Sequence, residues 1–133
     1  MTPQSGPLAK LIAWVIWFSI LMGLMIVQVF AAGGLPQGAD IGSPPFAFLA
    51  ITFSGFFLSV IVRWAVIPKV KKHETMMTVM VIGLASAEST GLLGMFFLSP
   101  DFTSAKTVAF VCAILGILQF APTYFPNPEE PRS

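Results

Sequence analysis

The chain has little charge. Only 10% of its 133 residues are charged, whereas 56% are hydrophobic. A soluble domain carries about 25% charged residues, so the composition indicates a membrane protein. The net charge of +1 gives no electrostatic basis for binding nucleic acid, and we expect none among the partners.

Cysteine and histidine are also scarce, with one of each. Cys112 lies within an apolar run, so it has no partner for an internal disulfide or a thiolate metal site. We interpret it as a buried or lipid-facing residue rather than a reactive thiol. His73 is too isolated to form a haem or metal site, and the chain has no glycine-rich phosphate loop and no nucleophile beside a base. We therefore expect no enzyme activity, no cofactor and no metal.

Long apolar runs are what the chain has in abundance. About 20 apolar residues, each rising about 1.5 Å, cross the hydrocarbon core of a bilayer. Four such runs occupy about residues 9–32, 46–67, 76–98 and 106–122. They predict an all-α, four-helix transmembrane bundle that forms one domain over residues 1–133.

Residues 123–133 are expected to form an extended tail, because proline interrupts helices. The prolines in and before this segment are Pro122, Pro126, Pro128 and Pro131. A helix in the fourth run is expected to reach about Thr123.

The basic residues predict the orientation of the chain. Six of the seven Lys and Arg residues fall in the N-terminal segment, around the second loop or in the C-terminal tail. They are Lys10, Arg63, Lys69, Lys71, Lys72 and Arg132, whereas Lys106 alone lies on the other side. Cytoplasmic segments carry the excess of positive charge, so both termini are expected in the cytoplasm.

One ionisable residue lies in the middle of an apolar run. Glu88 is next to Ala87, the midpoint of the third run. A carboxylate at that depth must find a partner, line a wet cavity or hold its proton. Arg63 is about 10 Å away along the membrane normal, at about 1.5 Å per residue. No other cation lies closer to mid-span, so the neutral acid is favoured. The candidate hydrogen-bond partners of Glu88 at a similar depth are the hydroxyl groups of Ser19, Thr52 and Ser54.

Small residues form a strip along the same run. At about 100° per residue they share one side of a helix. The strip consists of Gly83, Ser86, Ala87, Thr90, Gly91 and Gly94. Such a strip lets another helix approach closely in lipid. Glu88 lies beyond the Gly91 edge, so we expect it to open beside that contact, either in a crevice of the bundle or at a seam between subunits.

The segment VIGLASAESTGLLGMFF resembles the carboxylate-bearing helix of rotary-ATPase proteolipid (c-type) subunits. The likeness lies in Ala87, Glu88, Ser89 and Gly94, with the basic, proline-containing loop Pro68–Lys72 upstream. In that family the glutamate binds the transported proton or sodium ion. The resemblance implies that Glu88 is an ion-binding residue, supported by Ser89 or by the neighbouring backbone.

More of the chain resembles a group of small bacterial four-span membrane proteins. The shared features are Arg63, Ile67–Pro68, Ala87–Glu88 and Pro122–Thr123. This likeness implies a multi-pass protein of the bacterial inner membrane and carries no particular chemistry.

Two functions follow from these patterns. The first is a self-associating, proteolipid-like subunit in which Glu88 binds a proton or sodium ion. The alternative is a non-catalytic structural or assembly subunit, in which Glu88 only braces helix packing. Either function predicts the lipid bilayer as surroundings, and a homo-oligomer or a larger membrane complex as the assembled state.

Overall fold

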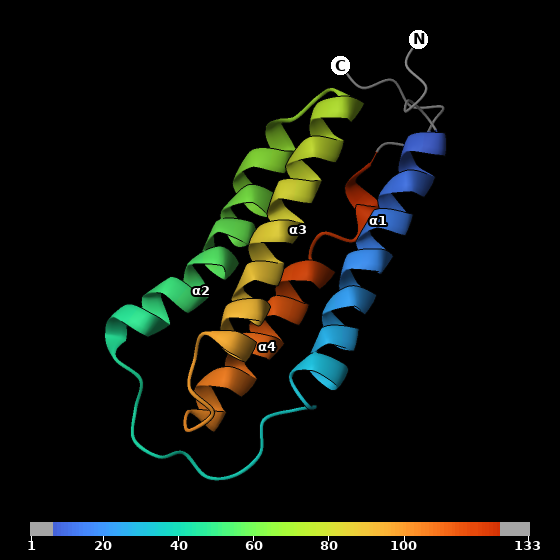
Figure 1. The fold of residues 1–133 in the computed structure, drawn as a ribbon. Helices are drawn as coiled ribbons and strands as arrows, with labels where there is room; N and C mark the ends of the chain where they lie inside the picture. Colours follow the sequence, from blue (N-terminus) through green and yellow to red (C-terminus); the bar gives the residue numbers. More distant parts are fainter. Residues whose placement is uncertain (1–6, 126–133) are drawn as a thin grey trace.

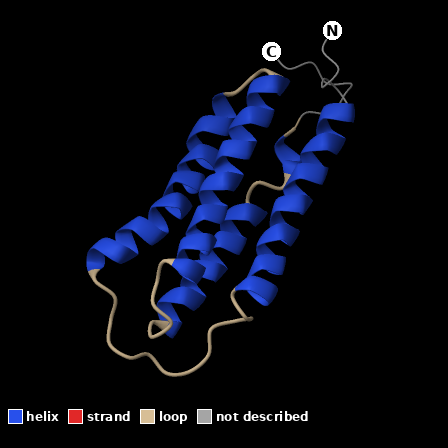
Figure 2. Cartoon of the chain, in the orientation of Figure 1, coloured by secondary structure: helices blue, strands red, loops and turns tan. Residues whose placement is uncertain are grey.

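Four long helices packed side by side make up the computed structural model, which describes residues 7–125 (Figure 1; Figure 2). They are α1 (Pro7–Ile26), α2 (Phe46–Ile61), α3 (His73–Phe96) and α4 (Thr103–Leu118). No strand occurs within these described residues. With the helical turns that extend them, all four are long and apolar enough to cross a membrane. The predicted all-α fold with four helices is confirmed, and the length and composition of these helices indicate a multi-pass membrane protein.

The first two helices end in π-helical turns. Turn η1 (Val27–Ala31) continues α1, and turn η2 (Val62–Val66) continues α2 into a 3-10 turn, η3 (Ile67–Lys69). A π-helical turn changes the direction in which its side chains point, and such turns are frequent at functional sites. One of these turns carries the buried Gln28, and the other carries Arg63.

The outer faces of the helices carry large apolar side chains. The exposed fractions of Phe18, Phe46 and Phe57 are 56%, 84% and 64%. In water such a surface would drive aggregation, whereas hydrocarbon solvates it. The exposed side chains therefore agree with four helices immersed in lipid.

Helix α3 is the centre of the bundle, with α4 packed against its strip of small residues. The helices touch at three levels, which are Ala87 with Gly116, Gly91 with Ala113, and Gly94 with Ala109. Phe120, just beyond α4, lies against Gly83. A Cβ atom at Gly94 would lie 2.5 Å from the Cβ of Ala109. The close approach therefore requires glycine at this seam.

Helix α2 packs on the next side of α3. A Cβ atom at Gly55 would overlap the backbone oxygen of Ser86. One residue further on, the backbone N–H of Phe56 donates a hydrogen bond of 2.8 Å to Thr90 Oγ1. Hydroxyl groups thus supply polar contacts across a seam at membrane depth.

The regular part of α4 ends near mid-membrane, earlier than the expected end at about Thr123. Phe120 faces Gly83, and the span Glu74–Phe96 has its midpoint close by, at Ala85. After Leu118 the chain leaves the helix, and it forms only a 3-10 turn, η4 (Pro122–Tyr124), before residue 125 (Figure 1). Residues 126–133 of the expected tail lie outside the described part of the chain.

Polar side chains satisfy the carbonyl groups where α4 ends. Trp17 Nε1 donates to the backbone oxygen of Ile117 at 2.7 Å. Arg63 Nε donates to the backbone oxygen of Gln119 at 2.7 Å, and the Tyr124 hydroxyl donates to that of Phe120 at 3.0 Å. The Ile117 oxygen also accepts the backbone N–H of Phe120 at 3.0 Å. An unsatisfied backbone group in hydrocarbon is costly, so the side-chain donors stabilise the irregular chain that follows α4.

The long loop between α1 and α2 supports the start of α4. The Asp40 carboxylate accepts a hydrogen bond of 2.7 Å from the backbone N–H of Ser104, in the first turn of α4. Hydrogen bonds from the Ser104 hydroxyl and from its backbone amide hold the pKa of Asp40 below its usual value. A carboxylate at a helix N-terminus also interacts favourably with the helix dipole.

We predict an acid-dependent loss of stability at this contact. A carboxylate whose pKa is lowered by folding stabilises the fold above its unfolded pKa of about 3.9, and this stabilisation disappears as the pH falls through the lower folded value. Thermal unfolding followed by circular dichroism measures this. Between about pH 6 and about pH 3, the midpoint temperature should fall less for Asp40→Asn than for wild type. Parallel pH profiles would contradict the prediction.

Candidate ion-binding site at Glu88

Glu88 lies three residues beyond Ala85, the midpoint of its span, which places it within about 5 Å of mid-membrane. Its side chain is half-buried and has no hydrogen-bond or ion-pair partner among residues 7–125. Within that range, Thr52 Oγ1 is the one fully buried side-chain oxygen or nitrogen without a hydrogen bond. The carboxylate oxygens of Glu88 therefore reach the molecular surface.

The side of α3 that carries Glu88 faces the edge of α1. Gly91 contacts Leu24 of α1 and Ala113 of α4, and Glu88 is rotated from it by about 60°. Met95, two turns further along the same side, is buried with an exposed fraction of 8%. Glu88 thus opens laterally, just past the contact between α1 and α3.

Ser89 lies on a different side of α3 from Glu88. Its hydroxyl donates to the backbone oxygen of Ser86 at 2.6 Å and lies against Gly55 of α2. The structure therefore does not bring the Ser89 hydroxyl together with the Glu88 carboxylate.

The three other hydroxyl groups expected at this depth are also apart from Glu88. The Ser54 hydroxyl donates to the backbone oxygen of Ile51 at 2.8 Å. Thr52 is fully buried, and Ser19 lies on the exposed side of α1. No hydrogen bond joins any of these three to Glu88 in the described part of the chain.

The predicted helix-packing residues all lie in seams within the chain. Three of them, Ala87, Gly91 and Gly94, contact α4, and Gly91 also contacts α1. Gly83 contacts Phe120, just beyond α4. Thr90 is fully buried and bonds α2. Because these seams are occupied, the strip is not a free surface for a second subunit.

A polar cluster around Gln119 was not anticipated from the sequence. Gln119 Nε2 donates to Ser59 Oγ at 3.2 Å, while its Oε1 accepts from Trp64 Nε1 at 3.0 Å. Its backbone oxygen accepts from Arg63, which leaves Arg63 bonded to α4 rather than to Glu88. The sequence does contain a sign of this cluster, because the polar Gln119 interrupts the fourth apolar run shortly before Pro122.

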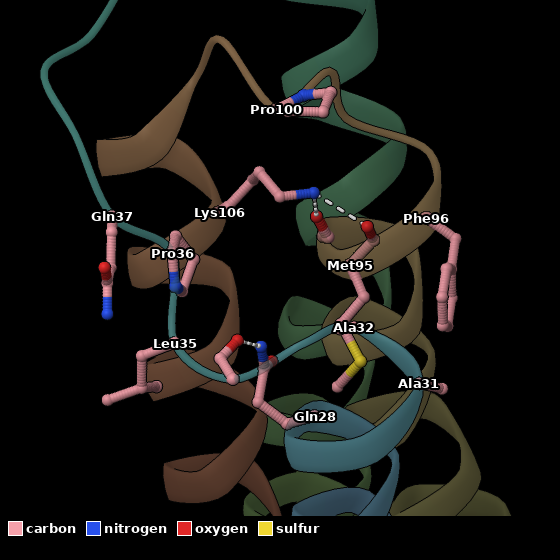
Figure 3. Close-up of a pocket in the computed structure, with 12 residues that line it drawn as sticks. Gln28, Ala31, Ala32, Leu35, Pro36, Gln37, Met95, Phe96, Pro100 and Lys106 are labelled. Carbon is pink, nitrogen blue, oxygen red and sulfur yellow. Dashed lines mark hydrogen bonds between the residues drawn. The ribbon is translucent and has the colours of Figure 1, made fainter.

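A pocket of about 360 Å³ lies at the other end of the bundle (Figure 3). Gln28, Met95 and Lys106 are among its lining residues. The Lys106 ammonium donates to the backbone oxygens of Gly94, Met95 and Leu98, at 2.9, 2.7 and 3.1 Å. Met95 is on the Glu88 side of α3, about 10 Å along the helix axis. The pocket therefore lies at the end of the bundle opposite the basic loop, about two helical turns from Glu88.

Comparisons with protein-family models, with curated proteins and with solved structures find no match to this chain. The likeness to proteolipid subunits and to small four-span proteins stays a prediction.

Proposed function

We propose that this protein is a small membrane subunit in which Glu88 binds and releases a proton. One observation carries the proposal: a carboxyl group at mid-membrane reaches the lateral surface and has no partner in the described chain. Ionisable groups at such depth are expensive, and they mark ion and proton pathways. The pocket lined by Met95 lies about two helical turns from Glu88 on the same side of α3.

A proton suits the surroundings of Glu88 better than a sodium ion does. Hard cations take several oxygen ligands. The ligand expected from the sequence, the Ser89 hydroxyl, lies against Gly55 of α2 and donates its hydrogen bond to the backbone oxygen of Ser86. A proton needs only the carboxylate itself.

The proposal includes an assembled state in the bacterial inner membrane. A lateral mid-membrane carboxyl is left at the edge of a single four-helix chain, so a second copy or another membrane subunit is expected to cover it. The distribution of Lys and Arg supports an orientation with both termini in the cytoplasm.

Bracing between subunits is the second candidate function. Glu88 has no partner inside the described chain, so a purely structural role would require a hydrogen-bond partner in a neighbouring subunit. In that case Glu88→Gln would retain a hydrogen-bonding side chain and would preserve assembly, with no proton function to lose.

Labelling with a hydrophobic carbodiimide tests the proton site. The reagent modifies protonated carboxyl groups in lipid, so mass spectrometry should find the adduct on Glu88 near neutral pH and none in Glu88→Gln. Glu74, exposed at the start of α3, is the internal control and should stay unlabelled. If sodium protects Glu88 from labelling, the site would be assigned to a sodium ion instead of a proton.

Proteoliposomes separate the two functions. Proton flux that disappears in Glu88→Gln, with the same oligomer in detergent, would support the proton site. Unlabelled Glu88 and equal flux in both proteins would reject it and leave the bracing role.

A further inference from the structure

A crevice lies between α2 and α4 at the end of the bundle opposite the basic loop. Its mouth is a cavity of about 380 Å³, lined among others by Asp40 of the long loop, Leu49 of α2 and Val108 of α4. A second cavity of about 460 Å³ continues along α2 as far as Phe57. Leu49 and Phe53 line both cavities, so the two form one crevice.

The start of α2 is attached to the end of α3 rather than to α4. The ring centroid of Phe48 lies 5.0 Å from that of Phe97, which directly follows α3. Leu49 is rotated from Phe48 by about 100° and lines the crevice. The first turns of α2 stand apart from α4 in Figure 1, and side chains of both helices line the hollow between them.

Hydrogen bonds fix the rim of this crevice. The Asp40 carboxylate accepts from the backbone N–H of Ser104 at 2.7 Å, and the backbone N–H of Ile41 donates to the backbone oxygen of Asp101 at 2.9 Å. Hydrogen bonds from Ser104 lower the pKa of Asp40, so the carboxylate is ionised near neutral pH. A carboxylate offers about four acceptor positions, which leaves capacity for a further donor. The described chain begins and ends at the opposite end of the bundle (Figure 1).

Contacts between helices give the depth of the rim. Ala85 is the midpoint of the α3 span, and Gly94, nine residues towards this end, lies against Ala109 of α4. Ser104 is five residues further out, so it lies about 21 Å from mid-membrane at about 1.5 Å per residue. Half of a bilayer with its headgroups is about 20–22 Å thick. Asp40, which is bonded to Ser104, is therefore at headgroup level.

The body of the crevice extends through one leaflet. Its lining residues on α2 run from Phe46 to Phe57, which is close to the midpoint of its span. These eleven steps rise about 17 Å, close to the half-thickness of the hydrocarbon core, about 15 Å. The small side chains of Ala50 and Ser54 leave room between the larger ones. The dimensions therefore match one extended acyl chain whose headgroup reaches the rim.

The charge at the rim favours a cationic headgroup. Asp40 is exposed and lines the mouth, and Asp101 is a second exposed carboxylate close by. Among the described residues, no Lys or Arg lines the crevice. A primary ammonium group donates charge-assisted hydrogen bonds to a carboxylate. Phosphatidylethanolamine is a membrane lipid that carries such a group.

We propose that the crevice between α2 and α4 binds a phospholipid with a primary ammonium headgroup. The ammonium group contacts Asp40, and one acyl chain lies along α2 against Ala50. This site is on a different side of the bundle from Glu88, and it does not depend on proton binding there.

Native mass spectrometry of the full-length protein tests the site, with phosphatidylethanolamine and phosphatidylcholine of the same acyl chains. Neither lipid carries a net charge, so the basic loop favours neither. Wild type should retain phosphatidylethanolamine in preference, because choline has no N–H group. Asp40→Asn keeps an acceptor for Ser104 and removes the charge. It should weaken phosphatidylethanolamine binding about fivefold, the upper end for an exposed ion pair.

Two pairs of variants supply the controls. Asp101→Asn removes an exposed carboxylate that lines neither cavity, and it should bind lipid as wild type does. Ala50→Phe fills the body of the crevice and should reduce lipid retention several-fold. Ala47→Phe adds the same ring on an exposed part of α2 outside the crevice, and it should leave retention unchanged. If Asp40→Asn does not fold, the two alanine variants decide.

Three results would overturn the site. They are equal retention of both lipids by wild type, an equal loss in Asp101→Asn, and unchanged retention in Ala50→Phe. If Ala50→Phe instead dissociates an oligomer while lipid retention stays the same, the crevice is an interface between subunits and the lipid is rejected.

Discussion

Replacing Gly55 by alanine is expected to destabilise the fold by about 3 kcal/mol, the upper end of the usual cost of overpacking. A Cβ atom at this position would overlap the backbone oxygen of Ser86 and the hydroxyl oxygen of Ser89. The serine hydroxyl can rotate away. The backbone oxygen belongs to α3 and cannot move unless the helices separate, which would also lengthen the bond from Phe56 to Thr90.

Gly23→Ala is the control, because Gly23 is also helical but has nothing within 4 Å of the new atom. Alanine is more favourable than glycine in a helix by about 1 kcal/mol, so the stability of Gly23→Ala should match or exceed that of wild type. Unfolding in mixed micelles of mild detergent and dodecyl sulfate, followed by circular dichroism, measures both. Equal midpoints for the two variants would show that α2 and α3 do not pack as closely as described.

Lys106→Met is expected to cost about 3 kcal/mol, since hydrogen bonds to a charged group contribute about 1.5–3 kcal/mol each and are not additive. The ammonium bonds three backbone oxygens where α3 ends, two of which are visible in Figure 3. Methionine keeps much of the apolar stem and removes every donor. The carbonyl groups of Gly94, Met95 and Leu98 would lose this partner, and the positive charge beside the helix C-terminus would disappear.

Lys71→Met controls for the loss of one charge, because Lys71 is exposed. The same unfolding measurement should place it within about 0.5 kcal/mol of wild type, as for most surface substitutions. Hydrogen exchange should also become faster in the last turn of α3 for Lys106→Met alone. Unchanged exchange in that turn would argue against Lys106 as its cap.

The number and type of helices could be predicted from the sequence because each apolar run is as long as the hydrocarbon core is thick. The depth of Glu88 follows from its place in its own run. Its side of α3 follows from helical periodicity, since Gly91 and Glu88 differ by a fixed rotation. These inferences use residues within one helix, where spacing determines geometry.

Contacts between helices could not be predicted in the same way. The end of α4 depends on Trp17, Arg63 and Tyr124, and the first is 100 residues from the carbonyl it bonds. The position of Ser89 depends on which helix covers that side of α3, and composition does not reveal that. The polar cluster around Gln119 joins the second and fourth spans, and spacing within either span gives no sign of it.

The short α4 also bears on how the nascent chain enters the bilayer. Its 16 helical residues extend about 24 Å, less than the core of about 30 Å, so the chain just beyond Leu118 lies in hydrocarbon without a regular helix. Trp17 and Arg63, which donate hydrogen bonds to backbone oxygens in this segment, belong to spans synthesised earlier. We therefore expect the earlier spans to assist insertion of the last one.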